Sequence, residues 1–235
     1  MNKNLNIVSL IPARSGSKGL KDKNIKLYKG IPLLAHSIKL SLECKYINET
    51  YVSTDSTIYQ EIALQYGSKN TPLRPKEISD DLSPDIDTFI HFINMYKDQN
   101  RLIPDIIVHL RPTYPNRNID LLNTCIEDFI KNYNNYDSLR TVVMIEKSPY
   151  KMYYIEDNKL TPYIKTHPSF HEPYNQARQN FPNTYLHNGC IDIVKTDVII
   201  NKNLLSGDKI YPFIMKDSEI DDIDNIKDFI KSENK

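Results

Sequence analysis

The sequence predicts an α/β domain built on a mainly parallel sheet. Short apolar runs rich in β-branched residues alternate with segments of helical spacing as far as Ile145. Such alternation is typical of βαβ units, whose strands run parallel. The informative polar motifs directly follow the apolar runs, which is where open parallel sheets bind ligands. A length of 235 residues suffices for one domain with a buried core, so we treat residues 1–235 as a single domain.

The first third of the chain contains two predicted strands and two predicted helices. The β-branched run Ile7–Ile11 opens into a Gly/Ser/Lys segment and predicts a buried first strand. Apolar residues at helical spacing predict a helix over Pro32–Leu42. A second strand is expected at Glu49–Val52 and a second helix at Thr57–Tyr66. The polar, proline-punctuated segment Ser68–Pro84 predicts a long loop, and long loops are often functional.

The middle of the chain continues the alternation and then departs from it. We expect a helix over Asp85–Tyr96, a strand at Ile106–Leu110, a helix over Ile119–Tyr133 and a strand at Ser138–Ile145. In Ser148–His187, tyrosines and prolines alternate with polar residues and the periodicity is weak. This segment is interpreted as an insertion with short strands that serves as a dimer arm or a lid.

The last part of the chain ends in an acidic turn and a helix. A final strand is expected at Cys190–Val194, followed by a stretch without a clear pattern. The acidic turn Asp221–Asp224 precedes a helix that begins at Asn225.

Composition excludes several classes of protein. Thirty Lys and Arg residues balance thirty Asp and Glu residues, whereas nucleic-acid binding requires an excess of positive charge. No apolar run has membrane-spanning length, and Met1–Asn6 lacks the features of a signal peptide. The three cysteines are far apart and form neither a C-x-x-C motif nor a zinc spacing. We therefore expect a soluble cytoplasmic protein that binds neither nucleic acid nor membranes.

A basic Gly/Ser loop, Arg14–Gly19, directly follows the first predicted strand. Its glycines permit a tight turn that brings backbone N–H groups to an anion, while Arg14 offers a planar fork of donors and Lys18 a point charge. The segment matches neither the Walker A pattern nor G-x-G-x-x-G. A solvated surface turn is the competing interpretation, but the position after a strand favours a triphosphate cradle.

A pair of carboxylates, Asp222 and Asp224, stands near the other end of the chain. Residues two apart in an extended segment face the same side, so both side chains can reach one Mg²⁺ ion. The alternative interpretation is an acidic N-terminal cap on the last helix, which the helix dipole favours.

A series of motifs, taken in order from residue 7 to about 229, resembles the acylneuraminate cytidylyltransferases, the CMP-sialic acid synthetase family. The resemblance covers nearly the whole chain, and the ordered set is far more specific than any single motif. The matching positions are Pro12–Gly19, Lys23–Ile25, Val52–Asp55, Leu73–Pro75, Leu110–Arg117, Ala177–Gln179 with Pro182 and Tyr185, Asn188 with Gly189, and Asp222–Asp224.

The resemblance implies a Rossmann-like nucleotidyltransferase fold, three-layered α/β/α, with a small inserted dimerisation lobe at residues 148–187. It implies transfer of CMP from CTP to the anomeric hydroxyl of a nine-carbon keto-acid sugar, such as sialic or legionaminic acid, with release of pyrophosphate. Mg²⁺ would be the cofactor, CTP and an acidic sugar the ligands, and a homodimer the assembly.

The resemblance also implies roles for individual residues. The catalytic residues would be Arg14, Lys18, Asp222 and Asp224. The nucleotide would be bound by Arg14, Ser15, Gly16, Ser17, Lys23, Asn24, Ser53, Arg74 and Ser83. The acceptor sugar would be bound by Arg111, Thr113, Lys151, Arg178, Gln179 and Asn188, with Arg178 at its carboxylate. The metal would be bound by Asp222 and Asp224.

Two residues depart from the family pattern. Arg111 stands where many members have Gln, near the expected sugar site, and Asp192 replaces a Tyr. Asp192 could meet an amino or acetamido group, bind metal or face solvent. The guanidinium of Arg111 suits a phosphate, which favours an alternative nucleotidyltransferase acting on a phosphorylated acceptor. A glycosyltransferase and a non-catalytic nucleotide- or sugar-binding module are more distant alternatives.

Overall fold

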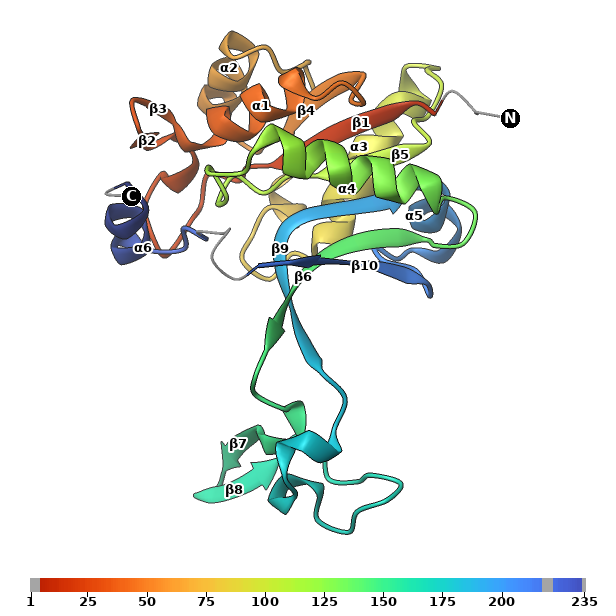
Figure 1. The fold of residues 1–235 in the computed structure, drawn as a ribbon. Helices are drawn as coiled ribbons and strands as arrows, with labels where there is room; N and C mark the ends of the chain where they lie inside the picture. The colour runs from red at the N-terminus through yellow and green to blue at the C-terminus, as the bar shows by residue number, and fades with distance from the viewer. Residues whose placement is uncertain (1–4, 217–221, 234–235) are drawn as a thin grey trace. The chain divides into compact units, whose positions relative to one another are not determined.

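The largest sheet among the described residues has six strands (Figure 1). The computed structural model describes residues 5–216 and 222–233. Of the predicted acidic turn, Asp221 therefore lies outside the described residues. The strand order is β10 (Ile210–Met215), β6 (Ser138–Ile145), β9 (Thr184–Lys195), β5 (Ile106–His109), β1 (Ile7–Pro12) and β4 (Glu49–Ser53).

Parallel pairing joins the strands from which the site is built. β1 pairs in parallel with β4 on one side, Pro12 opposite Ser53, and with β5 on the other, Leu10 opposite His109. β9 runs antiparallel to β5, with Asp192 opposite His109. The apolar run of β1 is buried along most of its length, as expected for a strand covered on both faces.

Helices cover both faces of the sheet and produce the predicted three layers (Figure 1). α3 (Asp85–Asp98) and α5 (Thr196–Lys202) share a buried apolar cluster with β1, β4, β5 and β9. On the opposite face, Ser41 of α1 (Leu33–Glu43) hydrogen-bonds to Ser9 of β1 and Thr50 of β4. α4 (Ile119–Lys131) lies beside α1, where Asn123 accepts a hydrogen bond from the Cys44 thiol. The mainly parallel α/β fold predicted from the sequence is confirmed.

The remaining elements are short. α2 spans Thr57–Gln65 and α6 spans Ile226–Glu233. Two-stranded ladders are formed by β2 (Leu27–Tyr28) with β3 (Ile31–Pro32) and by β7 (Tyr153–Glu156) with β8 (Lys159–Pro162). The 3₁₀ turns are Lys23–Ile25, Lys76–Ile78, Pro149–Lys151, Pro173–Asn175 and Arg178–Asn180.

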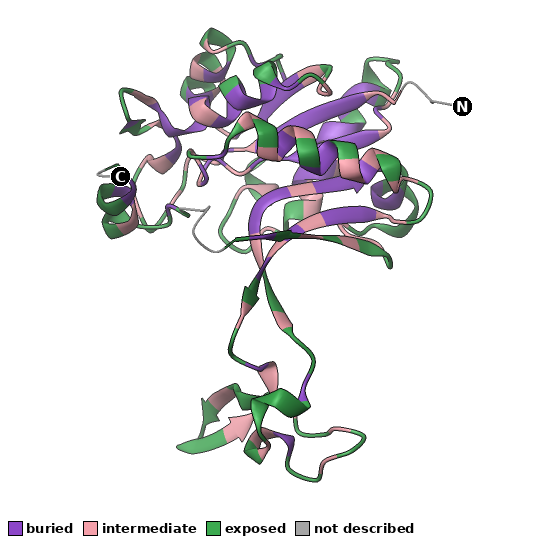
Figure 2. Cartoon of the chain, in the orientation of Figure 1, coloured by how far each residue is buried: buried purple, intermediate pink, exposed green. Residues whose placement is uncertain are grey.

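The chain divides into two compact units. The smaller comprises Val142–Asn188 and the end of β10, and the expected insertion at residues 148–187 falls entirely within it. Its interior is a small aromatic cluster in which Tyr150 stacks on Phe181 with ring centroids 4.4 Å apart. Figure 2 shows that few of its residues are buried, whereas the sheet of the larger unit is buried along most of its strands. Among the described residues, no helix is long and apolar enough to span a membrane.

Candidate functional site

A polar cleft opens where β1, β4 and β5 end, in the larger unit. Its lining includes Pro12 at the end of β1, His109 at the end of β5 and Arg74 from the loop beside β4. The backbone N–H of Arg74 donates to the Thr54 carbonyl at 2.8 Å, which ties that loop to the end of β4. The motifs that follow separate strands in the sequence therefore meet at the carboxyl edge of the sheet, as predicted.

The cations of the basic loop meet a carboxylate in this cleft. Arg14 and Lys18 both form ion pairs with Asp81, which belongs to the loop between the 3₁₀ turn Lys76–Ile78 and α3. The two cations lower the pKa of the Asp81 carboxyl, Lys18 contributing most. An anionic ligand that uses both cations must therefore displace Asp81 or share them with it.

Several hydrogen bonds hold the basic loop in shape. The Asp55 carboxylate accepts from the backbone N–H and the hydroxyl of Ser15, both at 2.8 Å. The side-chain amide of Asn24 donates to the Arg14 carbonyl at 3.0 Å, so Asn24 fixes the backbone that carries the first cation. Ser17 lines the cleft, and Gly16 is exposed on the same loop.

Arg74 is buried in the cleft with incomplete hydrogen bonding. Only 7% of the residue is exposed. Its Nη1 donates to Thr88 Oγ1 at 2.6 Å, while Nε and Nη2 have no hydrogen-bond partner among the described residues. Burial lowers the pKa of this guanidinium. Because unsatisfied buried donors are rare and costly, Nε and Nη2 are fitted to receive an oxygen from a ligand. Ser53, also predicted at the nucleotide, has a buried hydroxyl without a partner in the same part of the structure.

A buried isoleucine anchors the carboxylate pair. Ile223 is fully buried in a cluster with Tyr28, Leu33 and Phe229. Its backbone N–H donates to the Thr113 carbonyl at 2.9 Å, which ties the segment to the loop after β5. Ile223 thus fixes the position of its two neighbours, Asp222 and Asp224, in this non-helical segment.

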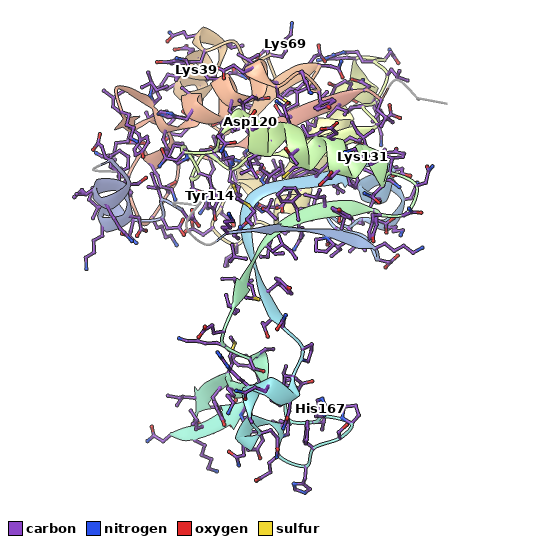
Figure 3. The ribbon with its side chains drawn as sticks, viewed as in Figure 1. Lys39, Lys69, Tyr114, Asp120, Lys131 and His167 are labelled. Carbon is purple, nitrogen blue, oxygen red and sulfur yellow. The ribbon has the colours of Figure 1, made fainter. Side chains whose placement is uncertain are left out.

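Asp222 and Asp224 bind different partners at the edge of the site. Asp222 accepts a hydrogen bond from the hydroxyl of Tyr114, labelled in Figure 3, at 2.8 Å. Asp224 forms an ion pair with Lys23 at 3.2 Å. Partial burial raises the pKa of Asp222, and the neighbouring charge of Asp224 raises it further, although the Tyr114 hydrogen bond lowers it.

The first loop and the carboxylate segment are in direct contact. Lys23 also donates to the Ile223 carbonyl at 2.9 Å. Gly19 packs against the Asp224 backbone, and a Cβ at this glycine would lie 2.7 Å from the Asp224 carbonyl oxygen. Lys23 and Ile223, which are 200 positions apart in the sequence, are therefore in contact, and Lys23 also lines the cleft.

The side chains of Asp222 and Asp224 do not cap the last helix, α6, which was the alternative interpretation of the acidic turn. The Asn225 side chain accepts from the backbone N–H groups of Lys227 and Asp228, and so caps α6. Asp228 in turn accepts from the backbone N–H groups of Asp224 and Asn225. The Asp222 and Asp224 side chains remain directed to Tyr114 and Lys23.

The donor set at the pair suits a hard divalent cation. Mg²⁺ characteristically takes one or two carboxylates and completes its shell with water and phosphate oxygens. Within residues 5–216 and 222–233, no group of three or more His, Cys, Asp or Glu side chains could hold a metal. The two carboxylates of Asp222 and Asp224 would leave room in the shell of such an ion for water and other oxygen ligands.

Arg111 lies in the cleft in an ion-paired state. Its Nη1 donates to Asp192 at 2.7 Å and to the Gly189 carbonyl at 2.9 Å. Its Nη2 lies 3.6 Å from Asp85. The two residues that depart from the family pattern thus contact each other, and Asp192 does not simply face solvent. Thr113 lines the same part of the cleft, and Ser83 lines it from the loop before α3.

Four of the residues predicted to bind the acceptor sugar belong to the smaller unit, whereas the residues that line the cleft all belong to the larger one. Arg178 pairs with Glu146 at 3.1 Å, and both side chains are more than half exposed. Such an exposed pair contributes little to stability and leaves Arg178 available to a ligand. Lys151 lies beside these two residues, Gln179 is exposed, and Asn188 contacts Met215.

Sequence reasoning missed several polar residues of the cleft. Asp81 lies in a loop without a recognisable motif. Asp85 and Thr88 belong to the first turns of α3, whose sequence contains no motif that indicates a binding site. Asp55 stood in the predicted Val52–Asp55 motif, and its position directly after a strand was the available signal. Tyr114 lies inside the Leu110–Arg117 motif but carried no distinguishing spacing.

The chain is similar to known cytidylyltransferases. The family model described as cytidylyltransferase matches residues 8–192. The N-acylneuraminate cytidylyltransferase of Escherichia coli O18:K1:H7 is 30% identical over 95% of this chain and 50% of its own length. The pseudaminic acid cytidylyltransferase of Campylobacter jejuni is 28% identical over 93% of this chain and 91% of its own.

A solved structure of similar fold is a CMP:2-keto-3-deoxy-manno-octonic acid synthetase complexed with CTP, which has a TM-score of 0.70 at 16% identity and 97% coverage of both chains. The present chain spans about half the length of the E. coli relative and nearly all of the C. jejuni one. The match of the family model, over a stretch that runs from the first strand to β9, shows that the chain belongs to the cytidylyltransferase family.

Proposed function

We propose that the protein transfers CMP from CTP to the anomeric hydroxyl of a nine-carbon keto-acid sugar and releases pyrophosphate. Among the acceptors that its relatives are named for are N-acylneuraminic, N,N'-diacetyllegionaminic and pseudaminic acids. The observation that carries the proposal is the ion pair between Asp224 and Lys23, because Lys23 lines the cleft together with Arg14 of the basic loop.

The chemistry of nucleotidyl transfer fits what the cleft supplies. The sugar hydroxyl oxygen bonds to the α-phosphorus of CTP while the bond from that phosphorus to the pyrophosphate oxygen breaks. This reaction requires alignment and charge neutralisation more than a protein nucleophile. Arg14, Lys18 and Lys23 would hold the triphosphate, Arg74 another nucleotide oxygen, and one carboxylate of the pair would take the hydroxyl proton.

Mg²⁺ is the proposed cofactor, held by Asp222 and Asp224. When bound, it would neutralise charge that develops on the phosphate oxygens. Asp224 would then exchange its ion pair with Lys23 for the metal, which frees the ammonium group for a phosphate. Asp222 would keep its hydrogen bond from Tyr114, which orients the carboxylate.

Pyrophosphate release tests the activity directly. Purified protein with CTP, Mg²⁺ and a panel of acidic nine-carbon sugars should release pyrophosphate with at least one acceptor. CTP should be preferred over ATP, GTP and UTP in the same assay. Equal use of all four nucleotides, or no release with any acceptor, would contradict the proposal.

A homodimer is the proposed assembly, with the smaller unit as its contact surface. The β7–β8 hairpin exposes 75% of Ile155 and 65% of Leu160, and the nearby Tyr163 is 67% exposed. Apolar groups exposed together often mark an interface. Light scattering should give a dimer for the wild type and a monomer for the double variant Ile155→Lys, Leu160→Lys.

A cytoplasmic location is also proposed. The three cysteines are free thiols, which supports it.

A further inference from the structure

Arg111 lines the cleft and forms an ion pair with Asp192, whereas Arg14 and Lys18 pair with Asp81. The Asp192 carboxylate is 2.7 Å from Nη1 and its side chain is only 13% exposed. His109, the cross-strand neighbour of Asp192, has its Nδ1 4.0 Å from the same carboxylate oxygen. The pair therefore links the end of β5 to β9 across the sheet.

The backbone around the pair is also fixed. The buried guanidinium of Arg117 donates to the Arg111 carbonyl at 2.5 Å and to the Cys190 carbonyl at 2.6 Å. Gly189 has a φ of +72°, and a Cβ there would lie 3.1 Å from Arg111 Nη1. The absence of a side chain at Gly189 lets its carbonyl accept from Nη1 beside Asp192. One edge of the Arg111 guanidinium is thus fully occupied.

The other edge carries Nη2, whose nearest described carboxylate is that of Asp85 at 3.6 Å, beyond hydrogen-bond distance. Asp85 is half exposed and lines the cleft, so Nη2 lies on the cleft side of the guanidinium. The carboxylates of Asp85 and Asp192 both lie near the single positive charge of Arg111. A phosphate at Nη2 would be repelled by both carboxylates, whereas a neutral oxygen would receive the hydrogen bond without that penalty.

We infer that Arg111, oriented by Asp192, determines acceptor specificity by donating from Nη2 to an uncharged oxygen of the sugar, such as the carbonyl of an acylamino group. Asp192 is then a positioning residue. This inference rests on the proposed function, and it argues against a phosphorylated acceptor.

Steady-state kinetics of four proteins tests the pair: wild type, Asp192→Asn, Arg111→Gln and the double variant. Each single change should raise the KM for an N-acylated acceptor about tenfold, the effect of roughly 1.4 kcal/mol of lost binding, and leave the KM for CTP within about twofold. The double variant should be no worse than Arg111→Gln alone. Arg111→Gln alone leaves the largely buried Asp192 carboxylate without its Arg111 partner, whereas the double variant no longer contains that carboxylate.

A purely structural role would instead lower the melting temperature and raise both KM values together, which would overturn the inference. Asp98→Asn, on an exposed carboxylate at the end of α3, is the matched control and should change neither.

Acceptor analogues test the chemical class. The N-acylated sugar should be preferred at least tenfold over its free-amine form in the wild type, and this preference should shrink in Arg111→Gln. Preference for a phosphorylated acid sugar would refute the inference while leaving cytidylyl transfer intact. If no acceptor releases pyrophosphate, the proposed function fails, and calorimetric titration of the N-acylated sugar in the presence of CMP still compares the wild type with Arg111→Gln. Equal affinities there would refute the role of the pair.

Discussion

Replacing Arg74 with methionine should separate stability from nucleotide binding. In the free protein, the buried guanidinium leaves Nε and Nη2 without partners among the described residues. A buried donor without a partner destabilises a fold by roughly 1–3 kcal/mol, and apolar replacements of buried charges are often neutral or stabilising. Methionine has a similar length and removes the donors. We expect Arg74→Met to unfold at a temperature equal to or higher than the wild type, by about 2–4 °C for each kcal/mol gained.

The same change should weaken CTP binding. A hydrogen bond from a charged donor to a ligand contributes roughly 1.5–3 kcal/mol, and 1.4 kcal/mol corresponds to a factor of ten in affinity. Loss of one such bond predicts a Kd for CTP that is about 10- to 100-fold higher. Nothing in the variant compensates, because Nη1 already donates to Thr88.

Thermal unfolding and isothermal titration of CTP on the same preparations measure both effects. Arg101→Met is the matched control, because the Arg101 guanidinium is satisfied by Tyr51 and Glu49 away from the cleft. That variant should be less stable and bind CTP normally. The reasoning would be refuted by an Arg74→Met protein that melts well below the wild type and binds CTP with unchanged affinity.

Three further predictions concern carboxylates. Asp81→Asn should lower the apparent KM for CTP about threefold, because Arg14 and Lys18 no longer pair with a charge; a higher KM in initial-rate assays would contradict this. Asp224→Asn should reduce kcat/KM at least ~100-fold while circular dichroism shows an unchanged fold, and wild-type activity would exclude Asp224 from the site. Lys202 and two backbone N–H groups lower the pKa of Asp137 to about 2, so its stabilising contribution is complete above pH ~4 and is lost as the pH falls through about 2. The difference in melting temperature between wild type and Asp137→Asn should therefore shrink over that interval.

Most of the fold was predictable because the strands that build the site are buried on both faces and flanked by polar motifs. The predicted run Ile7–Ile11 became β1, which extends one residue further, and Ser138–Ile145 became β6 without change. The segment after Val194 has no clear pattern in the sequence, yet it forms α5 and β10. β10 is the edge strand of the sheet and contains Pro212, which sequence rules disfavour in a strand interior.

The motifs of the site were predictable, but their pairing was not. Arg111 and Asp192 are 81 positions apart, and only the antiparallel register of β5 and β9 brings them together. The pairing of Asp81 with the two loop cations is likewise a tertiary contact from a loop of ordinary composition. The acceptor roles of Lys151 and Arg178 rest on the family resemblance and stay predictions, because both residues lie in the smaller unit.

A crystal structure of the protein with CTP and Mg²⁺ would test the central claim most directly, since it locates the nucleotide and the metal together. We predict electron density for the triphosphate between Arg14 and Lys18, with Asp81 displaced from at least one of them, and a Mg²⁺ ion on Asp222 and Asp224 that touches the same phosphates. A nucleotide bound outside this cleft, or a metal bound without either aspartate, would contradict the account.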